Sequence, residues 1–109
     1  MRDGIYKVSL QSGPLKGLLI GTLHDGRITG CDQTHHVTGE VIEIGGRITG
    51  TMVMHRHDKP EGFTEIANID VITVRFDGIA ADSVGQFDAT VAEKPGLKVK
   101  AAFQCLGDI

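Results

Sequence analysis

The sequence predicts one all-β domain, an eight-stranded antiparallel up-and-down barrel, and three observations support this fold class. The pentapeptide Gly-Arg-Ile-Thr-Gly occurs at residues 26–30 and again at 46–50, and each copy follows a tight-turn dipeptide, Asp-Gly or Gly-Gly. Apolar and polar residues alternate along most of the chain, whereas sustained helical periodicity is missing. Fifteen glycines and only three prolines among 109 residues suit short strands joined by tight turns.

The first four strands follow from this alternation. Residues 4–11 alternate with Tyr6 on the face that we assign to the core, because successive side chains of a strand point to opposite faces. Residues 17–24 form the second strand, which is apolar on both faces. Residues 27–31 form a short third strand within the first pentapeptide copy, and residues 36–44 form the fourth after a polar loop.

The fifth strand, residues 47–57, begins in the second copy of the pentapeptide. Its period of two predicts that Met52 and Met54 point into the interior. The next segment, residues 58–62, carries charges, a proline and a glycine, and these residues break the strand pattern. We therefore expect a long surface loop there.

Three further strands complete the count. Alternation resumes over residues 67–76 and is expected to end at the Asp-Gly dipeptide 77–78. Residues 84–92 form the seventh strand, and the Pro-Gly dipeptide 95–96 is expected to turn the chain. Residues 97–106 form the eighth strand, in which lysines alternate with apolar residues in the clearest half-buried pattern of the sequence.

Closure into a barrel is the expected architecture, because eight antiparallel strands that pair in a ring leave no edge exposed. A two-sheet sandwich is the alternative, but it needs longer crossovers than the short hairpins of this sequence supply. A barrel of this size is either filled by its own side chains or holds one small ligand. The side chains assigned to a ligand site in this interior are Tyr6, Met52, Met54, Phe87 and Phe103.

Two features of the composition leave open a partly empty interior. Aromatic residues make up only 5% of the chain. Several glycines stand inside the expected strands, where they contribute no side chain to the core. These glycines are Gly21, Gly39, Gly50 and Gly85.

The second strand also predicts a subunit interface. Leu18 and Ile20 point one way, and Leu19 and Leu23 point the other. One of these faces can fill the core, and large apolar patches on the surfaces of soluble proteins are typical of interfaces. We therefore expect a homodimer with a two-fold axis, and its interface is expected to include residues from Leu18, Leu19, Ile20 and Leu23.

Charge and composition exclude several partners. The net charge is −3 and the basic residues are scattered, so the positive patch of a nucleic-acid-binding protein is missing and no nucleic acid is expected as a direct partner. No apolar run approaches the ~20 residues that a membrane-spanning helix needs, and no signal-peptide pattern follows Met1. We expect a soluble, cytoplasmic protein in which Cys31 and Cys105 stay reduced.

Five short segments carry a family resemblance through their order and spacing. They are Met-Arg-Asp-Gly-Ile-Tyr-Lys-Val at 1–8, Asp-Gly-Arg-Ile-Thr-Gly-Cys-Asp at 25–32, Gly39, Met-His-Arg-His at 54–57 and Pro-Gly at 95–96. In these segments the chain resembles the GrlR-like family, which is named for negative regulators of type III secretion genes. The resemblance implies a small lipocalin-like barrel that dimerises, and a bacterial regulator that acts by binding another protein. The regulator that names the family holds its activator through an acidic loop of alternating Glu and Asp, a run that this chain lacks.

Histidines near one turn form the only candidate metal site that the spacing suggests. His55 and His57 are two apart on a strand and therefore share a face, while His35, His36 and Asp32 come from a neighbouring turn. A closed site needs three or four convergent ligands, and spacing places only two. Solvated histidines on a polar outer face are the favoured alternative, so neither a metal nor another cofactor is expected.

Catalytic residues are not expected. Nothing around Asp82 and Ser83 resembles a nucleophile elbow, and Glu40 and Glu43 lie on opposite faces of one strand, where they cannot act as a paired acid and base. Three hypotheses remain: a non-enzymatic regulatory protein that binds another protein, a carrier of a small apolar ligand inside the barrel, and a histidine-dependent metal enzyme. The first is favoured, because it combines the resemblance with the doubly apolar second strand.

Overall fold

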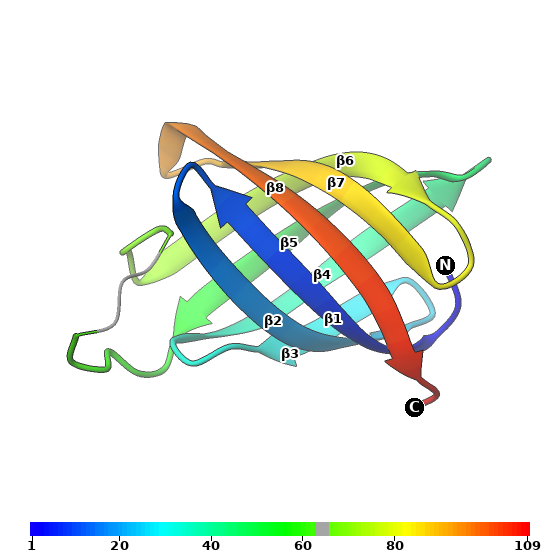
Figure 1. Ribbon diagram of the computed structural model, residues 1–109, viewed down its shortest axis with the longest axis horizontal. Helices are drawn as coiled ribbons and strands as arrows, with labels where there is room; N and C mark the ends of the chain where they lie inside the picture. The colour runs from blue at the N-terminus through cyan, green and yellow to red at the C-terminus, as the bar shows by residue number, and fades with distance from the viewer. Residues whose placement is uncertain (63–65) are drawn as a thin grey trace.

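The computed structural model describes residues 1–62 and 66–109 as one closed antiparallel barrel (Figure 1). Each strand pairs with the next along the chain, and β8 closes the barrel by pairing with β1. The predicted eight-stranded up-and-down barrel is therefore confirmed. Among the described residues no helix has the length and apolar character to cross a membrane. The strands are β1 (Gly4–Ser12), β2 (Leu15–His24), β3 (Arg27–Cys31), β4 (His35–Ile44), β5 (Arg47–Arg56), β6 (Val71–Ala80), β7 (Val84–Val91) and β8 (Lys94–Gly107).

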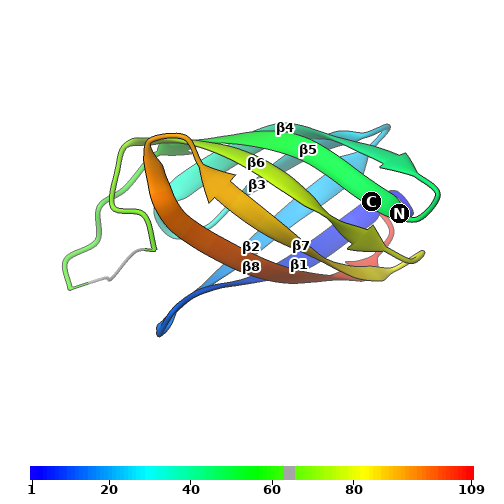
Figure 2. The ribbon, with the colours of Figure 1, turned by 90° about the horizontal axis from the view of Figure 1, so that it is seen from above.

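The two ends of the barrel are built differently (Figures 1 and 2). One end, here called the termini end, carries both chain termini and the short turns that follow β2, β4 and β6. The opposite end, the loop end, carries the turn after β1, the polar segment 32–34, the long connection between β5 and β6 and the turn at 92–93. Residues 58–62 belong to the long connection, as expected from their sequence.

Both pentapeptide copies begin at a hairpin turn with the backbone that their sequence predicts. Asp25 and Gly26 have φ angles of 50° and 77°, and Gly45 and Gly46 have φ angles of 60° and 81°. Positive φ at both central residues produces the two-residue turn whose twist matches that of the flanking antiparallel strands. The repeated Gly-Arg-Ile-Thr-Gly therefore marks the start of β3 and of β5.

Two predicted turns are wrong, because the strands run through both dipeptides. β6 passes straight through the Asp-Gly dipeptide at 77–78. A methyl group on Gly78 would overlap the carbonyl oxygen of Gln86 on β7, so this glycine permits the close approach of two strands. β8 likewise begins at Lys94, before the Pro-Gly dipeptide, and the chain turns at 92–93 instead.

The start of β6 also lies later than predicted. The strand begins at Val71 instead of residue 67. The backbone N–H of Ile69 donates a hydrogen bond to the carbonyl oxygen of Ala67 at 2.9 Å, and this tight bend keeps the segment before Val71 out of the sheet.

Aromatic rings fill the part of the interior nearer the termini. The rings of Tyr6 and Phe103 have centroids 5.9 Å apart, Phe103 lies 6.2 Å from Phe87, and Phe87 lies 4.9 Å from Phe76. In the strand register each of these four rings stands opposite a glycine, and Met52 does the same. The pairs are Tyr6 with Gly21, Met52 with Gly39, Phe76 with Gly50, Phe87 with Gly78 and Phe103 with Gly85. Most of these glycines thus make room for large neighbours, whereas a Cβ on Gly21 would first meet the backbone of β3. Empty space does exist inside the barrel at the loop end, so only the role given to the glycines is corrected.

The apolar side chains of β2 point to two faces of the strand, and only the outward face can belong to the predicted subunit interface. Leu19 and Leu23 are 3% and 5% exposed and point into the barrel, so their assignment to a subunit interface is corrected. Leu18 and Ile20 point outward and are 55% and 42% exposed. Residues an even number apart share a face, and a closed barrel has only one interior to fill.

Candidate functional site

The loop-end part of the barrel contains a partly open cavity of about 680 Å³, here called the loop-end cavity. Its floor is formed by Leu19, Met52 and Phe87, which also line a second cavity of only about 60 Å³ on the side of the termini. Aliphatic side chains form most of the remaining wall. The buried ones are Met54, Ala67, Ile72, Val74, Ala89, Val91 and Val99.

Side-chain size explains why the space lies at this end. On the inward faces of β7 and β8, Ala89 stands opposite Val99 beside the cavity. Nearer the termini the same two strands place Phe87 and Phe103 inside, and these rings reach into the middle of the barrel. An eight-stranded barrel is just wide enough for large side chains to fill, so small ones leave a void.

Among the described residues the barrel wall has a gap beside β2, here called the β2 gap, and residues on both sides of this gap line the cavity. β3 has only five residues, and its last pair with β2 joins Cys31 to Ile20. Residues 15–19 of β2 therefore have no strand partner on that side among the described residues. Ile20 and Cys31 line the cavity although they are exposed, because they form the rim of this gap. The side chain of Ile66 packs against Gly17 of this edge, since its Cδ1 lies 3.4 Å from the position that a Cβ on Gly17 would take.

A buried polar network fixes the mouth of the barrel beside the gap. Asp32 Oδ1 accepts hydrogen bonds from the backbone N–H groups of Thr34 (2.8 Å) and His35 (2.7 Å). The Thr34 hydroxyl lies 3.0 Å from the same oxygen and 2.7 Å from His35 Nδ1, and His35 Nε2 lies 2.8 Å from the carbonyl oxygen of Ile69. His35 is only 2% exposed. The network therefore ties the start of β4 to the long connection.

Two further groups of hydrogen bonds connect the strands at the mouth of the barrel. Arg56 donates from Nε to Asp70 Oδ1 at 2.8 Å and from Nη2 to Asn68 Oδ1 at 3.1 Å, so β5 is joined to the last part of the long connection. The Glu93 carboxylate accepts from the backbone N–H and the hydroxyl of Thr73, both at 2.7 Å, and these bonds lower the pKa of Glu93 below its ordinary value. They bind the turn between β7 and β8 to β6.

The five side chains predicted for an interior ligand site all lie inside the barrel, but two cavities divide them. Met52, Met54 and Phe87 line the loop-end cavity. Tyr6 and Phe103 line the small cavity nearer the termini. Ligand binding by these residues stays a prediction, and the geometry restricts it to the first three.

Tyr6 helps to close the termini end. Its hydroxyl donates a hydrogen bond to the carbonyl oxygen of Arg2. Burial, with a smaller contribution from Cys105, raises the pKa of Tyr6 to about 12. The phenol therefore stays neutral and keeps this hydrogen bond at physiological pH.

The five residues of the predicted histidine metal site do not converge on one ion. His35 is buried on the cavity side, and the Asp32 carboxylate is committed to the polar network. His57 Nε2 lies 3.0 Å from the carbonyl oxygen of Asp32. His36 and His55 are exposed on the outer wall, where their rings stack with centroids 5.3 Å apart.

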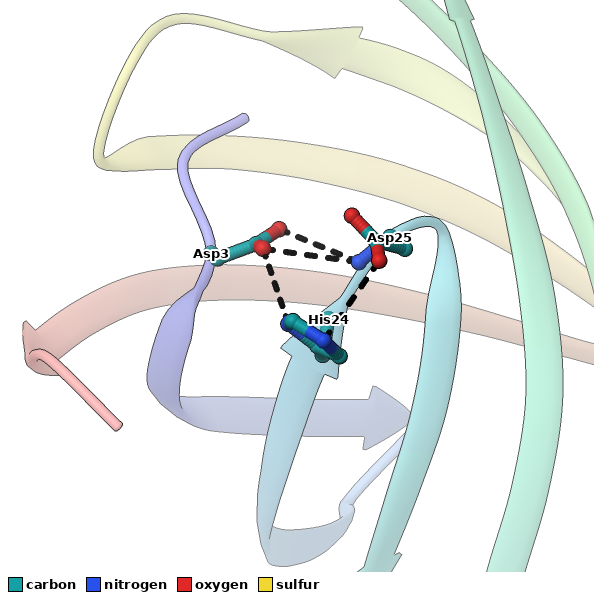
Figure 3. A group of neighbouring side chains, drawn as sticks. All are labelled: Asp3, His24 and Asp25. Atoms are coloured by element: carbon teal, nitrogen blue, oxygen red, sulfur yellow. Dashed lines mark hydrogen bonds and ion pairs between the residues drawn. The ribbon is translucent and has the colours of Figure 1, made fainter.

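A polar cluster at the termini end, made of Asp3, His24 and Asp25, was missed by sequence analysis (Figure 3). His24 Nδ1 lies 3.1 Å from Asp3 Oδ2, and Nε2 lies 3.4 Å from Asp25 Oδ2. The three exposed residues keep their potential ligand atoms within 4.8 Å of one another. Both ring nitrogens face carboxylates, so the cluster clamps the N-terminal segment to the turn after β2. The register that pairs Gly4 with Leu23 is the signal that would have found it.

Comparisons with known proteins leave the function to be argued from this geometry. No protein-family model matches the chain, and no curated protein matches it either. The resemblance to the GrlR-like family therefore stays a hypothesis.

Proposed function

We propose that this protein is a non-enzymatic carrier that holds a small apolar or amphipathic ligand in the loop-end cavity. The observation that supports the proposal is the cavity volume of about 680 Å³. Small-molecule sites typically span roughly 300–1,000 Å³ and are lined mainly by apolar side chains. Ligand carriage thus replaces protein-binding regulation as the leading hypothesis.

The wall of the cavity favours a slender, largely apolar ligand. Met52 and Met54 are unbranched and can adapt their shape to a narrow chain. Thr34 and His35 at the mouth already use their side chains within the polar network. Lys16, an exposed residue of β2 at the rim, supplies a positive charge that suits an anionic head group. A fatty acid combines a slender apolar chain, which suits the cavity wall, with an anionic head group, which suits Lys16.

The anionic fluorescent probe 1-anilinonaphthalene-8-sulfonate tests the cavity in solution. We expect saturable one-to-one binding of this probe, and displacement of the probe by a saturated fatty acid. Ala89→Phe is expected to abolish binding, because Ala89 is buried in the cavity wall and a phenyl ring there would occupy the ligand's space. Fluorescence titration measures both effects.

Ala102→Phe is the matched control, because Ala102 is exposed on the outer face of β8. This variant should bind the probe like the unmodified chain, and circular dichroism should show that both variants keep the sheet. Undiminished binding by Ala89→Phe would contradict the proposal, since the probe would then occupy an outer surface.

The protein-binding hypothesis has one specific observation in its favour, the edge of β2 over residues 15–19. Residues 15–19 line the β2 gap without a strand partner among the described residues on that side, and Leu18 within this edge and Ile20 just after it are exposed. An unpaired strand edge is a template for another strand. As the second candidate we propose that two copies of the chain pair along this edge about a two-fold axis, and that a regulatory partner uses the same edge.

Light scattering on Leu18→Lys tests this second candidate. We expect the unmodified chain to be a dimer at micromolar concentration and the variant to be a monomer, because a lysine would place a charge in the apolar contact. Ile42→Lys is the control, since Ile42 is also exposed but lies on β4. A monomeric unmodified chain would rule the candidate out.

A further inference from the structure

Cys31, His36 and His55 form an outward-facing row across three neighbouring strands. In the strand register Cys31 of β3 stands opposite His36 of β4, and His36 stands opposite His55 of β5. All three side chains are exposed, and the three strands are consecutive in the barrel wall (Figure 1). Directly opposed residues have Cβ atoms about 4.5–5.5 Å apart, so a thiol and two imidazoles stand within reach of one point above the central strand.

His36 and His55 differ from the other three histidines in the surroundings of their ring nitrogens. His24, His35 and His57 each place a ring nitrogen within hydrogen-bonding distance of an oxygen. In the part of the chain that the structure describes, His36 and His55 contact each other by stacking at an interplanar angle of 23° and have no hydrogen-bond partner for their rings. Their ring nitrogens can therefore offer lone pairs to a metal ion.

We propose that Cys31, His36 and His55 bind a borderline divalent metal ion, Zn²⁺ above all, on the outer wall of the barrel. One thiolate and two imidazoles are ligand types that zinc prefers, at distances of about 2.3 Å for sulfur and about 2.0–2.1 Å for nitrogen. Mg²⁺ and Ca²⁺ are disfavoured because they require oxygen ligands. Three protein ligands leave the fourth tetrahedral position to water. As they stand, the ligand atoms of these three side chains do not all lie within 4.8 Å of one another. Because the side chains are exposed, rotation among their staggered torsions would bring the ligand atoms to one ion.

The cluster of Asp3, His24 and Asp25 provides an internal comparison. Its two carboxylates suit a harder cation, and both nitrogens of His24 already face carboxylate oxygens. A zinc site on the outer wall therefore predicts that the loss of His24 leaves zinc affinity unchanged.

Titration of the full chain with Co²⁺ under a thiol-free reductant tests the proposal directly. Cobalt in place of zinc should give the near-ultraviolet charge-transfer band of a cobalt–thiolate bond and the visible bands of a tetrahedral ion, and Zn²⁺ should displace it. Cys31→Ser should eliminate the charge-transfer band. His36→Gln and His55→Gln should each weaken zinc binding by at least about tenfold, because even outer-shell partners of a metal contribute that much.

His24→Gln and Cys105→Ser are the matched controls, since they remove the same residue types elsewhere. Both should keep the spectrum and the zinc affinity of the unmodified chain. Absence of a thiolate band in the unmodified chain, or a loss of affinity in His24→Gln that equals the loss in His36→Gln, would overturn the proposal.

Discussion

Replacing Phe103 by alanine is expected to lower the free energy of unfolding by about 3–5 kcal/mol, the range found for truncation of a buried phenylalanine. Phe103 is 5% exposed and joins the rings of Tyr6 and Phe87 into one aromatic layer. Its ring also covers Gly85, which has no side chain to fill the space left behind. Because a domain of this size has a total stability of about 5–15 kcal/mol, the variant should be close to unfolding.

Urea unfolding followed by circular dichroism measures this difference. Leu106→Ala on the same strand is the matched control, because Leu106 is 53% exposed and its truncation removes apolar surface that water already contacts. A surface substitution of this kind usually changes stability by less than about 0.5 kcal/mol. Equal losses in the two variants would show that β8 does not point Phe103 into the core.

Local patterns in the sequence were sufficient to predict the strands and the closed barrel. The two turn dipeptides before the pentapeptide copies require positive φ, and the structure has positive φ at all four residues. Alternation in β8 correctly placed Val99 and Phe103 inside, because the opposite register would bury Lys98 and Lys100 without partners. The turns and the alternation depend only on residues that are close together in the chain, and they predict the barrel because consecutive hairpins bring the first and last strands side by side.

Features that depend on pairs of distant residues were not predicted. The Asp-Gly dipeptide at 77–78 looks like a turn, but Gly78 stands opposite Phe87, and only the strand register reveals that this glycine makes room for a neighbour. The same limit applies to the void in the barrel. Its place near the loop end follows from which small side chains face each other across the interior, such as Ala89 and Val99.

The candidate metal site shows the same dependence on register. Sequence spacing grouped His55 with His57, since residues two apart share a face of one strand. In the barrel, His55 instead meets His36 on the neighbouring strand, and His36 meets Cys31 on the next. Cross-strand neighbours are closer than residues two apart along one strand, so the pairing of strands decides which side chains share a site.

Replacing Gly50 by alanine is expected to destabilise the barrel by about 1–3 kcal/mol, the usual effect of overpacking a well-filled core. Gly50 closes the second pentapeptide copy and points inward. A methyl group there would overlap both the ring of Phe76 and the carbonyl oxygen of Glu40 on the preceding strand. Ordinarily alanine is better than glycine in a strand by roughly 0.5–1 kcal/mol, so the expected change has the opposite sign to the intrinsic preference.

Gly96→Ala is the control for this prediction, because no atom lies within 4 Å of the position that its Cβ would take and its φ is not positive. Its unfolding midpoint should stay equal or rise, whereas that of Gly50→Ala should fall.

Adding Phe76→Leu to Gly50→Ala removes the ring from the overlap but leaves the carbonyl oxygen of Glu40 in place. The double variant should therefore lose less stability than the sum of the two single variants, and the coupling energy in the cycle measures how much of the strain comes from the ring. Strict additivity would mean that the backbone of β4 alone sets the need for glycine at this position.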